Sequence, residues 1–593
     1  MRPTVELAQS TLFTQRCEAL SISDRIKLSY ERARAIGRAY ALTVKDVLFL
    51  SPKFWEMHTD PIACIDGAAE TLVTIQYNLC AGTLATYLQV QPSLAPVLQR
   101  VLNFEVSGQF CLTELGHGLD VIHMETTATL LPDGDFDLHT PLERAAKYMP
   151  PTSPVAAGLA CVAVVFARTV VNGEDHGVKP FVLQLHDGQS MTPGVTTKDL
   201  PPRGGSRPLN HSLTYFNHVR LPSTALLGSI KKPRDPRASF FEKIQRVAVG
   251  TLALSALCIP SLQVASYVAA RYSLRRTIVD ASGTSKPIIS FQTQKQPILT
   301  AVAQSFVFKA MYKQAIAWFT NPTLDPRVRH AVATVHKAAV VQASQIANLA
   351  LGDRCGAQGL FEANQLSAVH SDIRGVAIAE GDLLGISIRL ASELLLGRYA
   401  LEPPRYPDSL LAQHERGLFS ELRAILAAAP SHRSSTYDRD VLPRSLPLIQ
   451  AIGHRIAYDA ARAAQVDPPL LDLFEAASVL LDEAWYVENL GVSRAELRER
   501  EARAIEAAFP HLEEYLSRMD VAPYVVAPIV SDEKWGQFLG TLHQKEEEIA
   551  SVSAISDLGR PSVAAFLNKD DHSLNERATT LQIAPRGDIA VNV

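Results

Sequence analysis

The sequence predicts an α+β multidomain protein with an N-terminal helical domain, a middle β-barrel-like domain, a four-helix bundle and a further C-terminal helical domain. Three observations lead to this prediction. The chain of 593 residues is too long for one hydrophobic core, because single cores stop growing near ~250–300 residues. Apolar residues recur at helical spacing before residue 105 and after residue 239. Between these regions, short β-branched runs alternate with turn sequences.

The first helical region covers residues 23–105, where Leu72, Ile75 and Leu79 can share one helix face. From residue 108 to 238, runs such as "LACVAVVFARTVV" and "HSLTYFNHVRLP" are separated by the turns "PDGD", "NGED", "HDGQ" and "PPRGG", as expected of strands. The first two domains are therefore predicted at 1–107 and 108–238.

Helical periodicity resumes near residue 239, where Ala, Gly and Ser would let helices pack closely. Further helical patterns that make four antiparallel helices plausible lie at 291–319, 325–351 and 373–397. Proline, serine and charge concentrate around 400–446, a composition typical of a linker. The last two domains are therefore predicted at 239–428 and 429–593, the latter helical, with Ser493 and Glu496 spaced as a capping box.

Composition argues against several classes of function. The formal charge is -4 and the pI is near 6.5, and no cluster of Lys and Arg is dense enough to follow a phosphate backbone, so no nucleic-acid partner is expected. The seven cysteines are scattered without a C-x-x-C pair. This spacing argues against a metal site and a disulfide framework, and it favours a reducing compartment.

No membrane span or secretion signal is expected. The longest apolar run, Val155 to Ala167, has 13 residues, fewer than the ~18 that would span a bilayer. The N-terminus lacks the apolar core of a signal peptide, and the C-terminus "IAVNV" does not match the S-K-L peroxisomal signal. We therefore expect an intracellular protein, either cytoplasmic or peroxisomal.

The common cofactor and nucleophile motifs are missing from the sequence: G-x-G-x-x-G after a strand, G-x-x-x-x-G-K-[ST], H-E-x-x-H and G-x-S-x-G. What remains is the block "FCLTELGHGLDVIHMETTATLLPDGDFDLHTP" (110–141), a stretch without Lys or Arg. It resembles the T-E-x-G-H-G…E-T-T-A-T…H-T-P stretch of the acyl-CoA oxidases in the acyl-CoA dehydrogenase superfamily. The resemblance extends to 57–84, 201–228 and the helical bundle, and it weakens after residue 430.

The resemblance implies that the β domain binds FAD. Thr113 would contact the flavin ring, which is uncharged and needs hydrogen-bonding groups rather than salt bridges. Gly116 and Gly118 would let the backbone approach the ring or the substrate, and a simple β-turn is the alternative. "KYMPPT" (147–152) stands where the oxidases have K-W-W-P-G-G, so Thr152 is expected as a second flavin contact in a pocket of different shape.

The resemblance also implies a catalytic base in the bundle. The family's C-G-x-x-G followed by E-G-D matches "CGAQG" and "AEGDLLG", which places Gly356 and Gly359 at the cofactor and makes Glu380 the base that removes the α proton of a thioester. Apolar surroundings would raise the pKa of Glu380. The alternative is an acid favoured by the macrodipole at a helix start. Asp382 is interpreted as structural, and Leu383 follows where the oxidases usually have Asn.

Arg276 and Gln292 match the family's arginine followed by F-Q, and by resemblance they would hold the pyrophosphate and adenine of FAD. Solvated surface residues are the alternative. In the family these groups often reach FAD across a subunit interface, which implies at least a homodimer.

The implied reaction is α,β-desaturation of an acyl-CoA or another acyl thioester, with hydride passed to FAD and the flavin reoxidised by O2 to give H2O2. The family further implies that the Glu380 backbone N–H and a ribityl hydroxyl polarise the thioester carbonyl. Three alternatives stay open: a dehydrogenase that passes electrons to a partner flavoprotein, a tailoring enzyme for a specialised acyl or polyketide thioester, and a non-catalytic binding subunit. The sequence assigns no CoA-binding residue, acyl length or carrier.

Overall fold

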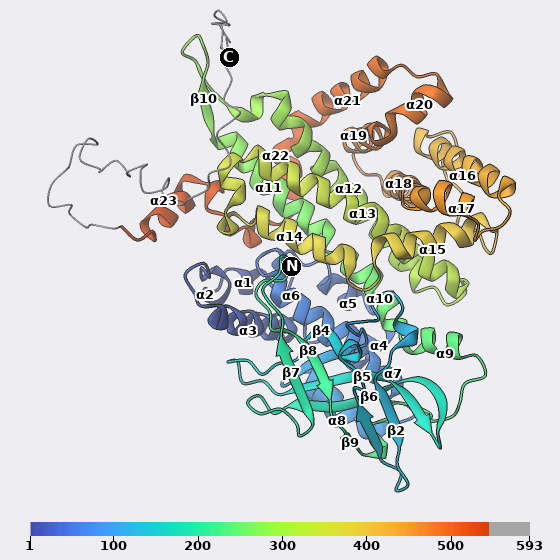
Figure 1. Ribbon diagram of the computed structural model, residues 1–593. Coiled ribbons are helices and arrows are strands. Elements are labelled where there is room, and N and C mark those ends of the chain that lie inside the picture. The colour runs from blue at the N-terminus through green and yellow to red at the C-terminus, as the bar shows by residue number, and fades with distance from the viewer. Residues whose placement is uncertain (1, 545–593) are drawn as a thin grey trace, which may run out of the picture. The chain divides into compact units, whose positions relative to one another are not determined.

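The computed structural model describes residues 2–544 of the chain. Residues 2–538 form one compact unit, and residues 539–544 belong to a second one. Within the first unit, a helical region, a β region and a long helical region follow one another along the chain, in the predicted order (Figure 1). The domain boundaries within that unit stay predictions, and residues 545–593 of the predicted last domain lie outside the described residues.

The N-terminal region is helical, as its periodicity predicts. Its α-helices are α1 (Val5–Ala8), α2 (Thr11–Thr14), α3 (Ile22–Tyr40), α4 (Val44–Phe49), α5 (Pro52–Met57), α6 (Gly67–Thr74), α7 (Gly82–Tyr87) and α8 (Ala95–Leu102). The sequence did not predict η2 (Ile75–Ala81), a π-helical segment between α6 and α7. Such segments are rare and are found frequently at functional sites, and this one contains Asn78 of the candidate active site.

The β region contains two sheets. One has the order β1-β5-β2-β3-β9, with β6 also paired to β5, and the other has the order β4-β8-β7. The strands are β1 (Ser107–Cys111), β2 (Thr127–Leu130), β3 (Phe136–His139), β4 (Lys147–Pro151), β5 (Cys161–Val171), β6 (Glu174–His186), β7 (Val195–Asp199), β8 (His211–Phe216) and β9 (Val219–Leu221). Parallel pairing of β1 and β5 aligns Ser107 with Cys161.

Strand β5 explains the longest apolar run of the sequence. Ala163 and Val165 belong to the core between the strands, whereas Val164 and Phe166 belong to the larger core shared with the helices. Side chains on a strand alternate between its two faces. From Cys161 to Ala167 the run is therefore apolar because both faces of β5 are covered.

The helical bundle begins directly after the β region. Its helices are α9 (Pro236–Lys243), α10 (Gln245–Ser255), α11 (Cys258–Arg275), α12 (Gln292–Phe319), α13 (Pro326–Arg354), α14 (Leu366–Ile378) and α15 (Leu383–Leu395). Helices α11, α12 and α13 pack against one another, and α14 and α15 pack on α13. A hairpin of β10 (Thr277–Val279) and β11 (Ser285–Pro287) joins α11 to α12 and projects from one end of these helices (Figure 1).

A continuous helical pattern over 373–397 is wrong. The chain leaves the helix after Ile378 and re-enters it at Leu383, because Glu380 and Gly381 have positive φ angles of 52° and 105°, which are incompatible with an α-helix. Asp382 caps the new helix, since its carboxylate accepts the Gly385 N–H at 2.9 Å. The break places Glu380 in a connection between two helices.

The region predicted as a linker contains a long helix, α16 (Leu410–Ala428), so proline and charge mark only its flanks. The helices that follow are α17 (Ser435–Asp440), α18 (Ser445–Ala463), α19 (Pro468–Val479), α20 (Glu483–Leu490), α21 (Arg494–Ala508), α22 (Leu512–Arg518) and α23 (Asp532–Gly540). The Ser493 hydroxyl accepts the Glu496 N–H at 3.1 Å, as the capping spacing predicts. Helix α18 packs on α12, α13 and α15 and so extends the core of the bundle.

One described helical stretch, Gln245–Arg275, is long and apolar enough to cross a bilayer when judged by length and composition alone. It consists of α10 and α11, and 89% of its most apolar window is buried inside the protein. Buried core helices pass the same test, so the stretch is weak evidence for a membrane span.

Candidate active site

Glu380 lies in the connection 379–382, in a backbone conformation that needs support from elsewhere. A non-glycine residue with positive φ costs on the order of 1–3 kcal/mol and persists only when its surroundings impose it. The Thr251 hydroxyl of α10 donates to the Glu380 carbonyl at 2.8 Å. The macrodipole explanation of this acid does not apply to the structure, because Asp382 is the residue that caps α15.

The Glu380 carboxylate is seated against α10 at Gly250. A Cβ atom on Gly250 would lie 1.0 Å from Glu380 Oε2 and 2.7 Å from Asn78 Nδ2, so this space exists only because the residue is glycine. Asn78 Nδ2 donates to Glu380 Oε2 at 3.1 Å. Gly250 and Asn78 together determine where one carboxylate oxygen lies.

Two buried cations lie near this carboxylate. Arg246 is 4% exposed, and it donates to the carbonyls of Asn78 at 2.9 Å and Val47 at 3.0 Å. Its Nη2 atom is buried without a hydrogen-bond partner in the described part of the chain. Lys337 is 0% exposed, and its ammonium group contacts the backbone on both sides of Glu380.

Burial raises the pKa of Glu380 to about 8, although Lys337, Arg246 and the Asn78 hydrogen bond all act to lower it. Burial likewise lowers the pKa of Lys337 to about 8 and that of Arg246 to about 10, against the attraction of Glu380. The direction for Glu380 is the one expected from its apolar surroundings. A carboxylate whose pKa lies near neutrality is a stronger base than an ordinary glutamate and suits proton abstraction.

Glu114, the second residue of the Thr-Glu pair in the 110–141 block, has a structural role. Glu114 and Lys147 are both 0% exposed at their side chains and form an ion pair at 3.0 Å. The Glu114 carboxylate also accepts the N–H groups of Glu125 at 2.7 Å and Thr126 at 2.9 Å. Burial alone would raise the pKa of Glu114, but Lys147 and these N–H donors hold the pKa below its usual value. The pair fixes the loop that follows Thr113.

Replacement of Lys147 by methionine is expected to lower the free energy of unfolding by about 3–5 kcal/mol, because Glu114 would stay buried without its cation. A second change, Glu114→Gln, should recover most of that loss. Urea denaturation measures both. The matched control is Lys198→Met in the exposed pair with Glu143, whose side chains are each 62% exposed, and there we expect little change. Equal losses at the two lysines would contradict the prediction.

Thr113 is half-buried and Gly118 is exposed. The Thr113 hydroxyl has no hydrogen-bond partner among the described residues, while its carbonyl accepts the Tyr148 N–H at 2.9 Å, so the 113–118 and 147–152 segments are adjacent. Nothing lies within 4 Å of the position that a Cβ of Gly118 would take. Leu119 of the same loop reaches the start of α15, with Cδ2 3.6 Å from the equivalent position at Gly385. The fold thus brings this loop to the helix that follows Glu380.

Thr152 is oriented differently from the expectation. It is fully buried, and its hydroxyl is hydrogen-bonded to the Thr214 hydroxyl at 2.7 Å. The Thr152 side chain is therefore already paired within the β region. Contact of this residue with a flavin would require its main chain or a change of partner.

The remaining predicted residues lie at the other end of the bundle. Arg276 follows α11, Gln292 begins α12, and Gly356 and Gly359 belong to η8 (Gly356–Leu360) after α13. The Arg354 guanidinium donates to the Thr293 carbonyl at 3.3 Å and so ties two of these helix ends together. Gly359 allows a close approach, because a Cβ there would lie 2.1 Å from the Gly352 carbonyl oxygen.

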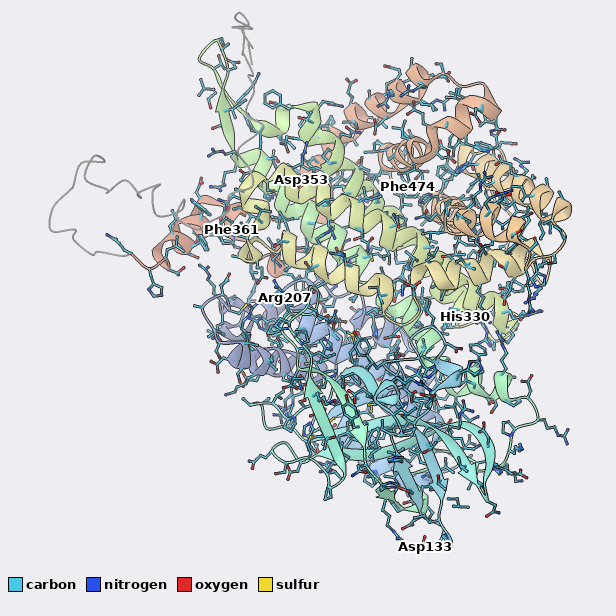
Figure 2. The ribbon with its side chains drawn as sticks, in the orientation of Figure 1. Asp133, Arg207, His330, Asp353, Phe361 and Phe474 are labelled. Atoms are coloured by element: carbon cyan, nitrogen blue, oxygen red, sulfur yellow. The ribbon has the colours of Figure 1, made fainter. Side chains whose placement is uncertain are left out.

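This second cluster is far from Glu380 within one chain. Lys337, beside Glu380, precedes Arg354 by 17 residues of α13, which corresponds to about 26 Å of helix. Figure 2 labels Asp353 near one end of α13 and His330 near the other. Arg276 and Gln292 are exposed, and the Arg276 side chain has no hydrogen bond or ion pair to another described residue.

Sequence reasoning missed Asn78, Arg246, Gly250 and Lys337. The signal that could have found them is polar or charged residues within apolar helical stretches, as in "QYNLCAG", "QRVAVG" and "TVHKAAVV", because a buried charge needs a partner. Which partner each one has is not readable from the pattern. Among residues 2–544, no three His, Cys, Asp or Glu side chains are grouped so that they could hold a metal ion.

Residues 251–395, which contain α11 to α15 and Glu380, match the family model described as "Acyl-CoA oxidase, C-alpha1 domain". In this part the chain is similar to the acyl-CoA oxidases. It is 25% identical over 409 residues to human peroxisomal acyl-coenzyme A oxidase 3, covering 64% of this chain and 57% of that protein. It is 26% identical over 317 residues to peroxisomal acyl-coenzyme A oxidase 1 of Arabidopsis thaliana, covering 49% and 47%. The aligned part thus spans about half the length of these relatives.

Solved structures of acyl-CoA oxidases share the fold. The tomato enzyme (Lycopersicon esculentum) superposes with a TM-score of 0.76 at 16% identity, covering 92% of this chain and 93% of that one. Acyl-CoA oxidase 1 of Yarrowia lipolytica gives a TM-score of 0.74 at 16% identity, covering 97% and 94%. At this identity the likeness shows the acyl-CoA oxidase fold and leaves the chemistry to the residues of this chain.

Proposed function

We propose that the protein is an FAD-dependent acyl-CoA oxidase that forms an α,β double bond in an acyl thioester, with O2 as electron acceptor. The observation that supports this most directly is the Glu380 carboxylate, held between Gly250 and Asn78 with its pKa raised to about 8. It lies in the part of the chain that matches the family model. Glu380 is the residue that takes the α proton.

The residues near Glu380 and in the 110–152 segment fit FAD. A flavin ring needs uncharged hydrogen-bonding groups, and the Thr113 hydroxyl has no hydrogen-bond partner among the described residues. Glu114 and Lys147 neutralise each other in this segment. Bound FAD would supply the hydride acceptor. A related structure is of acyl-CoA oxidase-1 from Caenorhabditis elegans complexed with FAD and ATP, which supports the same cofactor here.

The chain's own groups prepare the proton transfer. Asn78 orients one carboxylate oxygen, and the Gly250 surface stops that oxygen from moving toward α10. Arg246 and Lys337 favour the ionised carboxylate, while burial weakens its hydration. Substrate binding would remove more water, so the carboxylate would meet the α proton as a poorly solvated base.

A homodimer is part of the proposal. Arg276, Gln292, Gly356 and Gly359 lie at helix ends of the bundle remote from Glu380, so one chain does not bring them to Thr113 and Glu380. A second copy of the chain could bring its Arg276 cluster to the FAD beside the first copy's Thr113. The arginine is free to meet a phosphate, because it has no ion pair among the described residues. Sedimentation analysis with and without FAD tests the assembly.

The acyl carrier is proposed as CoA, because the relatives are named acyl-coenzyme A oxidases. One neighbour, acyl-CoA oxidase-2 of C. elegans, is described as bound with FAD, ascaroside-CoA and ATP, so large acyl groups are suitable members of a substrate panel. The relatives from human and Arabidopsis are named peroxisomal. On that basis we propose an intracellular location, peroxisomal or cytoplasmic.

The purified protein is expected to show flavin absorbance and to lose it on anaerobic mixing with at least one acyl-CoA of a panel. Readmission of air should restore the colour rapidly and release H2O2. Slow reoxidation that an electron-transferring flavoprotein accelerates would indicate a dehydrogenase instead. A protein that stays colourless after addition of FAD would contradict both and indicate a binding subunit. Bleaching only by carrier-protein thioesters would indicate a tailoring enzyme.

A further inference from the structure

Lys337 is hydrogen-bonded to the backbone before and after Glu380, the residue that we propose as the base. Its ammonium group donates to the carbonyl oxygens of Ala379 and Gly381, each at 2.6 Å. These two residues directly precede and follow Glu380. Lys337 itself lies on α13 with 0% exposure, among apolar residues of the bundle core. Burying an ammonium group costs free energy unless its charge is compensated, so packing alone does not account for a lysine here.

We propose that Lys337 is a positioning residue for Glu380, holding the backbone of Glu380 and Gly381 in its positive-φ conformation and placing a positive charge beside the carboxylate. The inference rests on the proposed role of Glu380 as the base. The carbonyls of Ala379 and Gly381 both point at this ammonium group, whereas the Glu380 carbonyl between them points at Thr251 of α10. Positive φ at Glu380 and Gly381 is the conformation in which the structure achieves this.

The charged groups around Lys337 and Glu380 determine in which direction the loss of Lys337 shifts the pKa of Glu380. Lys337 faces Glu380, Cys258 of α11 and Asp382 at the start of α15. Glu380 faces Lys337, Arg246 of α10 and the Asn78 amide of η2. Burial raises the pKa of Glu380, and Lys337 is the foremost group that lowers it. Without Lys337, burial would be opposed by Arg246 and Asn78 alone, and the pKa of Glu380 would rise further.

The first test is the pH profile of anaerobic flavin reduction by an acyl-CoA. In Lys337→Met, the limb that reports ionisation of the base should move to higher pH by about 1 unit or more. Reduction at pH 7 should then slow at least about tenfold, because a smaller fraction of Glu380 is ionised. The substrate dissociation constant should change little. Lys337→Arg keeps the charge, and its profile should return toward that of the unmodified protein.

The second test needs neither substrate nor FAD reduction. A carboxyl group whose folded pKa is raised stabilises the fold most below its unfolded pKa of about 4.3, and this contribution is lost as the pH rises to about 8. The melting temperature of the full chain relative to Glu380→Gln should therefore fall with pH and then level off. In the Lys337→Met background the levelling should occur at higher pH.

Lys179→Met is the matched control. Lys179 is also buried, at 2% exposure, donates to a backbone carbonyl, that of Lys231, at 2.9 Å, and has a pKa lowered by burial to about 8. It lies on β6, and its replacement should leave both pH profiles unchanged. If Lys337→Met does not fold, Lys337→Gln, which removes the charge and keeps a donor, is used in its place.

An unchanged profile in the Lys337 variant, or an equal shift in Lys179→Met, overturns the inference. Failure of the unmodified protein to be bleached by any acyl thioester would overturn the proposed function. The melting comparison would still decide whether Lys337 sets the ionisation of Glu380.

Discussion

Glu380→Gln is expected to slow flavin reduction by about 10²–10⁴-fold, the range that a positioned general base contributes. Glutamine has the shape of glutamate, and its amide oxygen can still accept the Asn78 N–H that now lies 3.1 Å from Glu380 Oε2. The seat at Gly250 also stays filled. The protein should therefore keep its fold and its yellow FAD, and lose only the group that accepts the proton. Anaerobic stopped-flow mixing with an acyl-CoA, followed at the flavin band, measures the effect.

Asp382→Asn is the matched control for this variant. Asp382 is two residues away and caps α15 through the Gly385 N–H, and asparagine is an equally good N-cap residue. Its reduction rate should stay within a few-fold of the unmodified protein. Bleaching of Glu380→Gln at the unmodified rate would remove Glu380 from the role of base.

The glutamine variant should also change the stability in a pH-dependent manner. Above about pH 8 the unmodified protein contains an ionised, poorly hydrated carboxylate at this position, since burial raises the pKa of Glu380 to about 8. The variant has no such charge. Its melting temperature relative to the unmodified protein should therefore be higher at pH 9 than at pH 5, and a constant difference would contradict the raised pKa.

Gly250→Ala is expected to reduce the same rate by about 10²-fold or more, although it adds a single methyl group. That Cβ would lie 1.0 Å from Oε2 and 2.1 Å from Cδ of Glu380, so the carboxylate has to leave its seat and lose Asn78. Misplacing a catalytic group by about 1 Å can cost 10²-fold. Alanine favours a helix over glycine by about 1 kcal/mol, which should preserve α10. The readouts are the reduction rate and the circular dichroism.

Gly352→Ala separates this steric effect from helix propensity. Gly352 is also helical, on α13, and nothing lies within 4 Å of the position of its added Cβ. We expect unchanged reduction and a slightly higher melting temperature. Equal rates of flavin reduction in Gly250→Ala and Gly352→Ala would mean that the Glu380 carboxylate does not lie against Gly250 in the working enzyme.

Strands and helices could be predicted from the sequence where neighbouring residues alone determine them. The β-branched run "LACVAVVFARTVV" between turn sequences predicts a strand, and the structure adds why the run is apolar on both faces, namely that two cores meet at β5. Helical periodicity locates α12 and α13 to within a few residues. It fails at 379–382, because apolar spacing continues through a break that hydrogen bonds from other helices impose. The same periodicity gave no sign of the π-helical turn at Asn78.

Some residues of the candidate site could be selected from the sequence, but their contacts could not be predicted from it. Motif resemblance selects Glu380 and Thr113 from the sequence, because in each case a short stretch has a recognisable spacing. Resemblance also selects Thr152, but it gives no warning that the Thr214 hydroxyl is its partner. Its stated departure from the family pattern is the only local sign that this segment differs.

By itself, the sequence determined that a helical region, a β region and a second helical region follow one another. It also determined the absence of the common nucleotide motifs and the position of one acid in an otherwise apolar stretch. These are properties of neighbouring residues. Only the tertiary structure decided that Asn78, Gly250 and Lys337 meet that acid, from segments separated by up to 302 residues. The physical reason is that burial, charge pairing and close approach depend on which surfaces pack together, and a chain position alone does not state its partners.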